Sequence, residues 1–267
     1  MQSRTSEVLS RNKQDGSGSL IGYFPAGYPT LDDSVAAAVA MCKNGVDVLE
    51  LGVPYSDPVM DGLVIQEATE TALANGFKLK QVFEAVKAIT AQVDTPVLVM
   101  TYWNPVLSYG LENFARDLKA AGGAGLITPD LIPDEAAKWL EVSDELELDR
   151  VFLAAPTSSV ERIKTACDLS RGFVYAVSTM GITGTRDSVD DLAKKVVSGI
   201  RDASKTQNTA VGIGISTSAQ VVDVNAYADG AIVGSAFVKA YASGGISALT
   251  EKVKEISSGI HQLNQFF

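Results

Sequence analysis

The chain has 267 residues, 46% of them hydrophobic and 20% charged, which is the composition of an ordinary globular protein with ample material for a core. Its net charge of −10, with no basic cluster, argues against a nucleic-acid partner. The single histidine, His261, lies near the C-terminus, which excludes a Ser-His-Asp triad and any multi-histidine metal site. Acid-base chemistry must therefore come from carboxylates, tyrosines or lysines.

No apolar run approaches the roughly 20 residues that cross a bilayer, and the N-terminal segment lacks the apolar stretch of a signal peptide. We therefore expect a cytoplasmic protein with no membrane association. Cys42 and Cys167 are far apart within expected helices, so we interpret both as reduced packing residues.

Strands and helices are predicted to alternate along the whole chain. Residues 1–15 form an amphipathic segment, expected to be a helix that closes the bottom of the fold. Apolar runs bounded by Gly, Pro and Asp predict strands at 20–24, 46–51, 96–100, 125–128, 151–154, 173–177, 210–213 and 231–233. Helical patterns are predicted between and after them, at 31–44, 78–91, 111–121, 133–140, 159–170, 189–203, 219–227 and 246–259.

Alternating strands and helices imply a parallel sheet with right-handed crossovers. Eight such units in about 250 residues match a closed barrel better than an open sheet. The predicted fold is an α/β (βα)8 TIM barrel with an extra N-terminal helix, in one domain spanning residues 1–267.

The second predicted strand carries Glu50, and the loop after it ends in Asp61. Because strand side chains alternate between faces, Glu50 shares a face with Val48 and Gly52 and lies among apolar neighbours. Burying an unpaired carboxylate costs enough free energy that its pKa usually shifts, so the pattern indicates a proton-transfer group. Gly52 is expected to leave open space beside it. For Glu50 alone, an exposed strand-end glutamate is the alternative interpretation.

Catalytic groups of such barrels lie at the carboxyl ends of the strands. The turns after the last three strands are rich in glycine, as the motifs GITG, GIGIS and VGSA show. There, backbone N–H groups and a helix N-terminus are expected to hold a phosphate without basic residues. Alternatively, each glycine simply serves a tight turn. The predicted phosphate-binding residues are Gly184, Gly214, Gly234 and Ser235.

Over nearly its whole length the chain resembles the alpha subunit of tryptophan synthase. The most specific segment is LELGVPYSDPVMDG at 49–62, supported by YFPAGYP around Tyr23, MTYWNP from Met100 and the three glycine motifs. The resemblance implies a lyase of tryptophan biosynthesis that reversibly cleaves indole-3-glycerol phosphate, by a retro-aldol reaction, to indole and glyceraldehyde 3-phosphate. It implies Glu50 as the acid and base and Asp61 as the acceptor of the indole N–H. It requires no metal and no cofactor in this chain.

By the same resemblance, the segments 54–62 and 178–189 would close over the substrate. The family works as an alpha-beta-beta-alpha heterotetramer whose beta subunit carries pyridoxal phosphate. Residues 55–58 and 104–105 would meet that subunit, with Val59 and Trp103 as apolar anchors. The implied substrate-binding residues are Tyr23, Ile65, Met100, Tyr102, Leu153, Tyr175, Thr183 and Ile232.

Two other hypotheses stay open. One is another phosphate-binding barrel, an isomerase or decarboxylating synthase acting on a related sugar phosphate. Such enzymes commonly rely on a lysine or a different acid pair. The other is a catalytically idle barrel that serves as an allosteric module for a partner enzyme. Indole release, sugar-phosphate isomerisation and turnover by the isolated chain distinguish the three.

Overall fold

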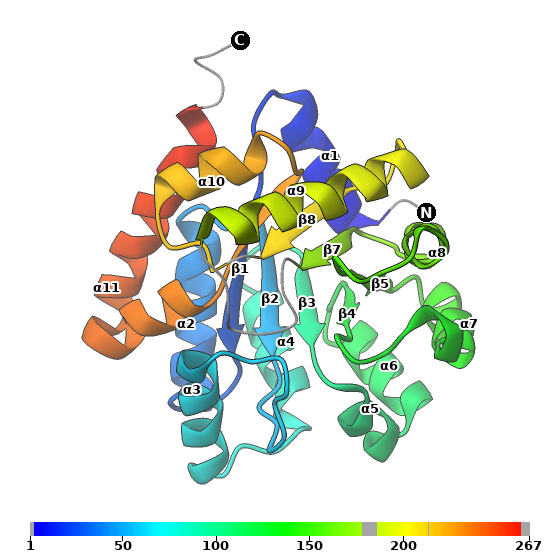
Figure 1. Ribbon diagram of the computed structural model, residues 1–267. Coiled ribbons are helices and arrows are strands. Elements are labelled where there is room, and N and C mark those ends of the chain that lie inside the picture. The colour runs from blue at the N-terminus through cyan, green and yellow to red at the C-terminus, as the bar shows by residue number, and fades with distance from the viewer. Residues whose placement is uncertain (1–2, 178–185, 213, 263–267) are drawn as a thin grey trace.

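The computed structural model describes residues 3–177, 186–212 and 214–262. Within these ranges nine strands form one sheet in which every pair of neighbouring strands is parallel (Figure 1). The strands are β1 (Leu20–Pro25), β2 (Val48–Gly52), β3 (Val97–Met100), β4 (Gly125–Ile127), β5 (Asp149–Val151), β6 (Leu153–Ala154), β7 (Val174–Val177), β8 (Thr209–Gly212) and β9 (Gly230–Val233).

The sheet closes through one strand that changes its partner. The strand order is β5-β4-β3-β2-β1-β9-β8-β7-β6, and only Phe152 separates β5 from β6 in the sequence. β5 pairs with β4, whereas β6 pairs with β7, and the Phe152 carbonyl accepts a hydrogen bond from the Tyr175 N–H at 3.0 Å. β5 and β6 together therefore take the place of the single strand expected at 151–154. The predicted TIM barrel, with eight strand positions around it, is confirmed.

Helices surround the barrel in the predicted order. Among the described residues they are α1 (Arg4–Gln14), α2 (Leu31–Lys43), α3 (Leu63–Ala74), α4 (Gln81–Thr90), α5 (Trp103–Tyr109), α6 (Leu111–Ala120), the 3-10 turn η1 (Pro133–Glu135), α7 (Ala137–Glu145), α8 (Val160–Leu169), α9 (Arg186–Ala203), α10 (Ser218–Asn225) and α11 (Ser235–Gln262). Of these, α3 and α5 were not predicted. Pro105 lies in the first turn of α5, where its missing N–H has no intrahelical acceptor to lose.

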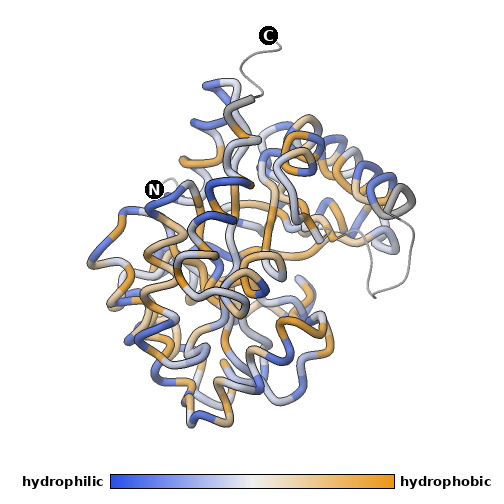
Figure 2. The backbone as a smooth tube through the Cα atoms, turned by 90° about the vertical axis from the view of Figure 1, so that its left-hand side faces the viewer, coloured by the Kyte–Doolittle hydropathy of each residue, from blue (hydrophilic) through white to orange (hydrophobic). Residues whose placement is uncertain are grey.

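The barrel interior is apolar, and α1 closes it at the end where the strands begin. Ile21, Val48, Leu98 and other inward-facing side chains form one buried cluster that includes Leu9 of α1. Figure 1 shows α1 beyond that end, opposite the arrowheads. The N-terminal helix predicted to close the barrel is therefore present. Hydrophobic residues concentrate along the strands, and hydrophilic ones lie mainly on the outer helices and loops (Figure 2).

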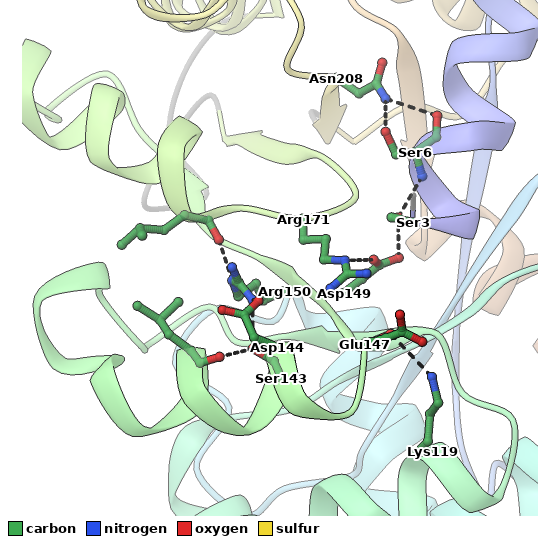
Figure 3. A network of polar contacts seen from close by, with 12 residues as sticks. Ser3, Ser6, Lys119, Ser143, Asp144, Glu147, Asp149, Arg150, Arg171 and Asn208 are labelled. Carbon is green, nitrogen blue, oxygen red and sulfur yellow. Dashed lines mark hydrogen bonds and ion pairs between the residues drawn. The ribbon is translucent and has the colours of Figure 1, made fainter. Parts of the chain in front are cut away.

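Polar contacts attach the start of α1 to the barrel (Figure 3). The Ser3 hydroxyl accepts a hydrogen bond from the Ser6 N–H at 3.0 Å and donates to the buried Asp149 carboxylate at 2.7 Å. Arg171 Nε lies 3.8 Å from the same carboxylate. The Asn208 side-chain amide donates to the Ser6 hydroxyl at 3.0 Å. A helix cap and a buried acid thus stabilise each other.

In the described part of the chain, no helix combines the length and the hydrophobicity needed to span a bilayer.

Candidate active site

A cavity of about 400 Å³ lies at the carboxyl ends of the strands. Ten of the residues singled out from the sequence line it: Tyr23, Glu50, Asp61, Ile65, Met100, Tyr175, Gly214, Ile232, Gly234 and Ser235. Eight further residues complete the wall: Met60, Gly62, Val64, Gly212, Ile215, Ser216, Ala236 and Lys239. Side chains from both ends of the sequence therefore converge on one space.

Four predicted residues are not among the lining residues. Leu153 packs against the apolar cluster inside the barrel, below the cavity. Tyr102 is buried and contacts the loop after β2 instead. Thr183 and Gly184 lie outside the described residues, as do residues 178–185 of the closing segment predicted at 178–189, whose last four residues begin α9.

Glu50 faces the cavity from β2. It lies opposite Tyr23 in the β1–β2 register and points inward, as does Val48 two residues before it. Its side chain is only 1% exposed, and no described residue donates a hydrogen bond to its Oε1. Burial raises the pKa of Glu50 to about 8. At neutral pH this group is therefore a protonated acid that faces an open cavity.

Asp61 lies at the end of the loop after β2, immediately before Gly62, which caps α3. The Gln66 side-chain amide donates to the Asp61 carbonyl at 2.8 Å and so holds the backbone of this residue in place. Partial burial raises the pKa of Asp61 to about 6. Near pH 7, Asp61 is thus mainly ionised while Glu50 is mainly protonated.

Aromatic residues hold the loop that carries Asp61. The Met60 N–H donates to the Tyr102 hydroxyl at 2.9 Å. The rings of Tyr102 and Tyr55 lie 5.3 Å apart, and the Asn104 side chain donates to the Tyr55 hydroxyl at 3.2 Å. The loop is therefore attached to the start of α5, a contact that no sequence pattern indicated.

Two phenols lie close to both acids. Burial, and then the charges of Asp61 and Glu50, raise the pKa of Tyr23 well above its ordinary value. A Cβ atom at Gly52 would lie 2.2 Å from the Tyr23 hydroxyl oxygen. The expectation of open space beside Gly52 was therefore wrong, because Tyr23 fills it. The pKa of Tyr175, like that of Tyr23, is raised by burial and then by the charges of Glu50 and Asp61.

Another part of the cavity wall comes from the segments that follow β8 and β9. Gly214 has a φ of +74°, a conformation that favours glycine, and α11 begins at Ser235. The Phe237 and Val238 N–H groups bond to the Gly234 carbonyl, whereas the first amides of a helix have no intrahelical acceptor. At this helix those first amides belong to Ser235 and Ala236, both lining residues. The part of the cavity wall at the start of α11 is therefore suited to bind an anion.

The expected absence of basic residues from this end was wrong, since Lys239 also lines the cavity. The sequence VGSAFVK contained the signal, because Lys239 follows Ser235 by four residues, the spacing of one helix face. The described residues contain no candidate metal site, because no group of three or more His, Cys, Asp and Glu among them is arranged to hold an ion.

Comparisons with known proteins agree with this geometry. The sequence profile of the family "Tryptophan synthase alpha chain" matches residues 9–265. A tryptophan synthase alpha chain of Leifsonia xyli is 59% identical over 257 residues, covering 96% of this chain and 98% of that protein. A structure of Mycobacterium tuberculosis tryptophan synthase superposes with a TM-score of 0.91 at 47% identity, covering 97% of this chain and 99% of that one. A tryptophan synthase complex of Pyrococcus furiosus gives a TM-score of 0.81 at 36% identity, with 91% and 98% covered. The chain therefore belongs to the tryptophan synthase alpha chain family.

Proposed function

We propose that this chain cleaves indole-3-glycerol phosphate reversibly to indole and glyceraldehyde 3-phosphate, in tryptophan biosynthesis. The observation that carries the proposal is Glu50, a buried carboxyl group with an unpartnered oxygen that faces the same cavity as Asp61. A buried acid without a partner costs stability, so its retention indicates a task on a ligand.

The proposed reaction moves two protons. Protonated Glu50 donates a proton to C3 of the indole ring, and positive charge develops at the ring nitrogen. The resulting carboxylate accepts the proton of the hydroxyl group on the adjoining glycerol carbon. That oxygen forms a carbonyl, the carbon-carbon bond breaks, and its electron pair restores the aromatic indole. Asp61 accepts a hydrogen bond from the ring N–H and stabilises the transient charge.

The electrostatics of the two acids suit these roles. Burial raises the pKa of Glu50 to about 8 and that of Asp61 to about 6. Between these values the donor holds its proton while the stabilising carboxylate is charged. Two carboxyl groups whose environments separate their pKa values are a common way to divide acid and base roles. The pH dependence of kcat/KM is therefore expected to be bell-shaped, with its maximum near pH 7.

Apolar side chains would hold the indole ring, and the backbone of the segments after β8 and β9 would hold the phosphate. Ile65, Met100 and Ile232 supply apolar surface beside Glu50. Gly214, Gly234 and Ser235 would surround the phosphate, together with Gly184, which lies outside the described residues. Thr183, also outside them, is assigned to the substrate by family resemblance. No step of this mechanism needs a metal or a cofactor bound to this chain.

We further infer a cytoplasmic alpha-beta-beta-alpha assembly with a beta subunit that carries pyridoxal phosphate. The Pyrococcus furiosus relative was solved as a tryptophan synthase complex. In this chain, three large apolar side chains on the loop after β2, α3 and α5 are exposed: Val59 at 80%, Leu63 at 69% and Leu107 at 56%. Such exposure fits a partner surface.

The test is direct. Purified chain is incubated with indole-3-glycerol phosphate and indole is measured, alone and with a tryptophan synthase beta subunit. We expect indole in both cases, with a many-fold increase when the partner is present. A Glu50→Gln variant that stays folded and still releases indole at the original rate would exclude the proposed role of Glu50. Isomerisation of a sugar phosphate without indole release would favour the other enzyme class.

A further inference from the structure

The cavity has an unbalanced set of charges for a phosphorylated substrate. A phosphate ester carries about −1.5 to −2 charges at pH 7. Two carboxyl groups already face the cavity, and of these Asp61 is mainly ionised near pH 7 whereas Glu50 keeps its proton. Among the described lining residues, Lys239 is the only basic side chain. A backbone cradle alone would have to hold a dianion beside an ionised Asp61.

Lys239 lies where an ion pair with the phosphate is possible. It follows Ser235 by four residues in α11, so both side chains project from the same face of the helix at its N-terminal end. Both residues are exposed and line the cavity. The positive end of the helix dipole adds to the attraction of the ammonium group for an anion.

Lys239 is not committed to another group. It forms no ion pair within 4.0 Å with a described residue, whereas Lys252, in the later part of α11, pairs with Glu255 at 2.8 Å. The unpartnered, buried oxygen of Glu50 in the same cavity is an independent sign that a ligand completes this space. An unpaired lysine that lines this cavity is therefore available to bind an anionic ligand.

We propose that Lys239 binds the substrate phosphate through an ionic contact and thereby selects phosphorylated over unphosphorylated glycerol side chains. The inference rests on the proposed lyase function for the identity of the substrate, and it assigns the anion contact to a side chain rather than to backbone alone. Lysine suits this role because it acts as a mobile point charge toward phosphate.

The first experiment needs no turnover. Glycerol 3-phosphate is titrated calorimetrically into the full chain and into Lys239→Met, Lys239→Arg and Lys254→Met. Lys254 is an exposed lysine of α11, beyond the non-helical backbone at Gly244 and Gly245, and it does not line the cavity. Its replacement makes the same change in net charge. We expect Lys239→Met to weaken binding about tenfold at low salt and less at high salt. Lys239→Arg and Lys254→Met should stay within about threefold of the original affinity.

The second experiment separates binding from chemistry. In indole formation, Lys239→Met should raise KM about tenfold and leave kcat within about twofold, because the phosphate contact is the same in substrate and transition state. The proposal would be overturned if Lys239→Met and Lys254→Met lost the same affinity for glycerol 3-phosphate. It would also be overturned if Lys239→Met lowered kcat and left KM unchanged, or if the parent chain did not bind glycerol 3-phosphate. Binding that depends on Lys239 without any indole release would instead refute only the lyase function.

Discussion

Replacing Glu50 by glutamine should make the protein more stable as well as inactive, and more so at high pH. In the folded chain Glu50 is 1% exposed, and burial raises its pKa from 4.5 to about 8. Between these two values the folded state keeps a proton that the unfolded state has released. Unfolding therefore releases a proton in this window, and the free energy of unfolding must fall as pH rises through it.

The size of the effect follows from the two pKa values. A difference between 4.5 and about 8, at about 1.4 kcal/mol per pKa unit, sets an upper limit of roughly 5 kcal/mol above pH 8. Relaxation around a newly charged buried group reduces this cost, so we expect about 3 kcal/mol at pH 9 and a small difference at pH 5. Glutamine has nearly the same shape and no proton to lose, so its variant avoids this cost.

Urea unfolding of the parent chain and Glu50→Gln at intervals from pH 5 to pH 9 measures the difference. Glu67→Gln, at an exposed position on α3, is the matched control. Its free energy of unfolding should change with pH as that of the parent chain does. A constant difference between Glu50→Gln and the parent across this range would refute the reasoning, because it would mean that Glu50 titrates alike in both states.

Three further changes test other parts of the site and fold. Asp61→Asn should lower kcat for indole formation about 100- to 1000-fold and remove the rise in kcat/KM through pH 6; an unchanged acidic limb would contradict the proposed role. Tyr102→Phe removes the acceptor of the Met60 N–H, so steady-state kinetics should show kcat/KM reduced about tenfold, and full activity would mean that the loop does not depend on this bond. Ser3→Ala removes a helix cap and a hydrogen bond to Asp149 and should lower the free energy of unfolding by about 1–2 kcal/mol in urea, with kcat unchanged; equal midpoints would contradict the contact.

The barrel and its acidic centre were predictable because both depend on short-range periodicity. Alternation along β2 placed Glu50 and Val48 on the inner face, and the structure has them there. Strand spacing likewise predicted the eight strand positions. The split at Phe152 was not predictable, because it depends on which neighbour each half of the strand meets.

Contacts between distant segments were the part that the sequence did not reveal. Gly52 appeared to leave a gap, but the residue that fills it, Tyr23, belongs to the preceding strand and reaches across by the length of its ring. For Tyr102, no sequence pattern indicated that its hydroxyl accepts a hydrogen bond from the Met60 N–H. The sequence pattern predicts a helix only from residue 246, beyond the non-helical backbone at Gly244 and Gly245, so it does not place Lys239 on a helix face.

The proposed proton-transfer groups come from residues 50–61, near the start of the chain. The described residues proposed to hold the phosphate come from residues 214–239, near its end. The two sets share a cavity but no strand or helix. Mutations in the early strands can therefore change the reaction while the later segment continues to bind the phosphate group of the substrate. For an enzyme designer, this separation offers two independently adjustable halves, one for reactivity and one for retention of the substrate.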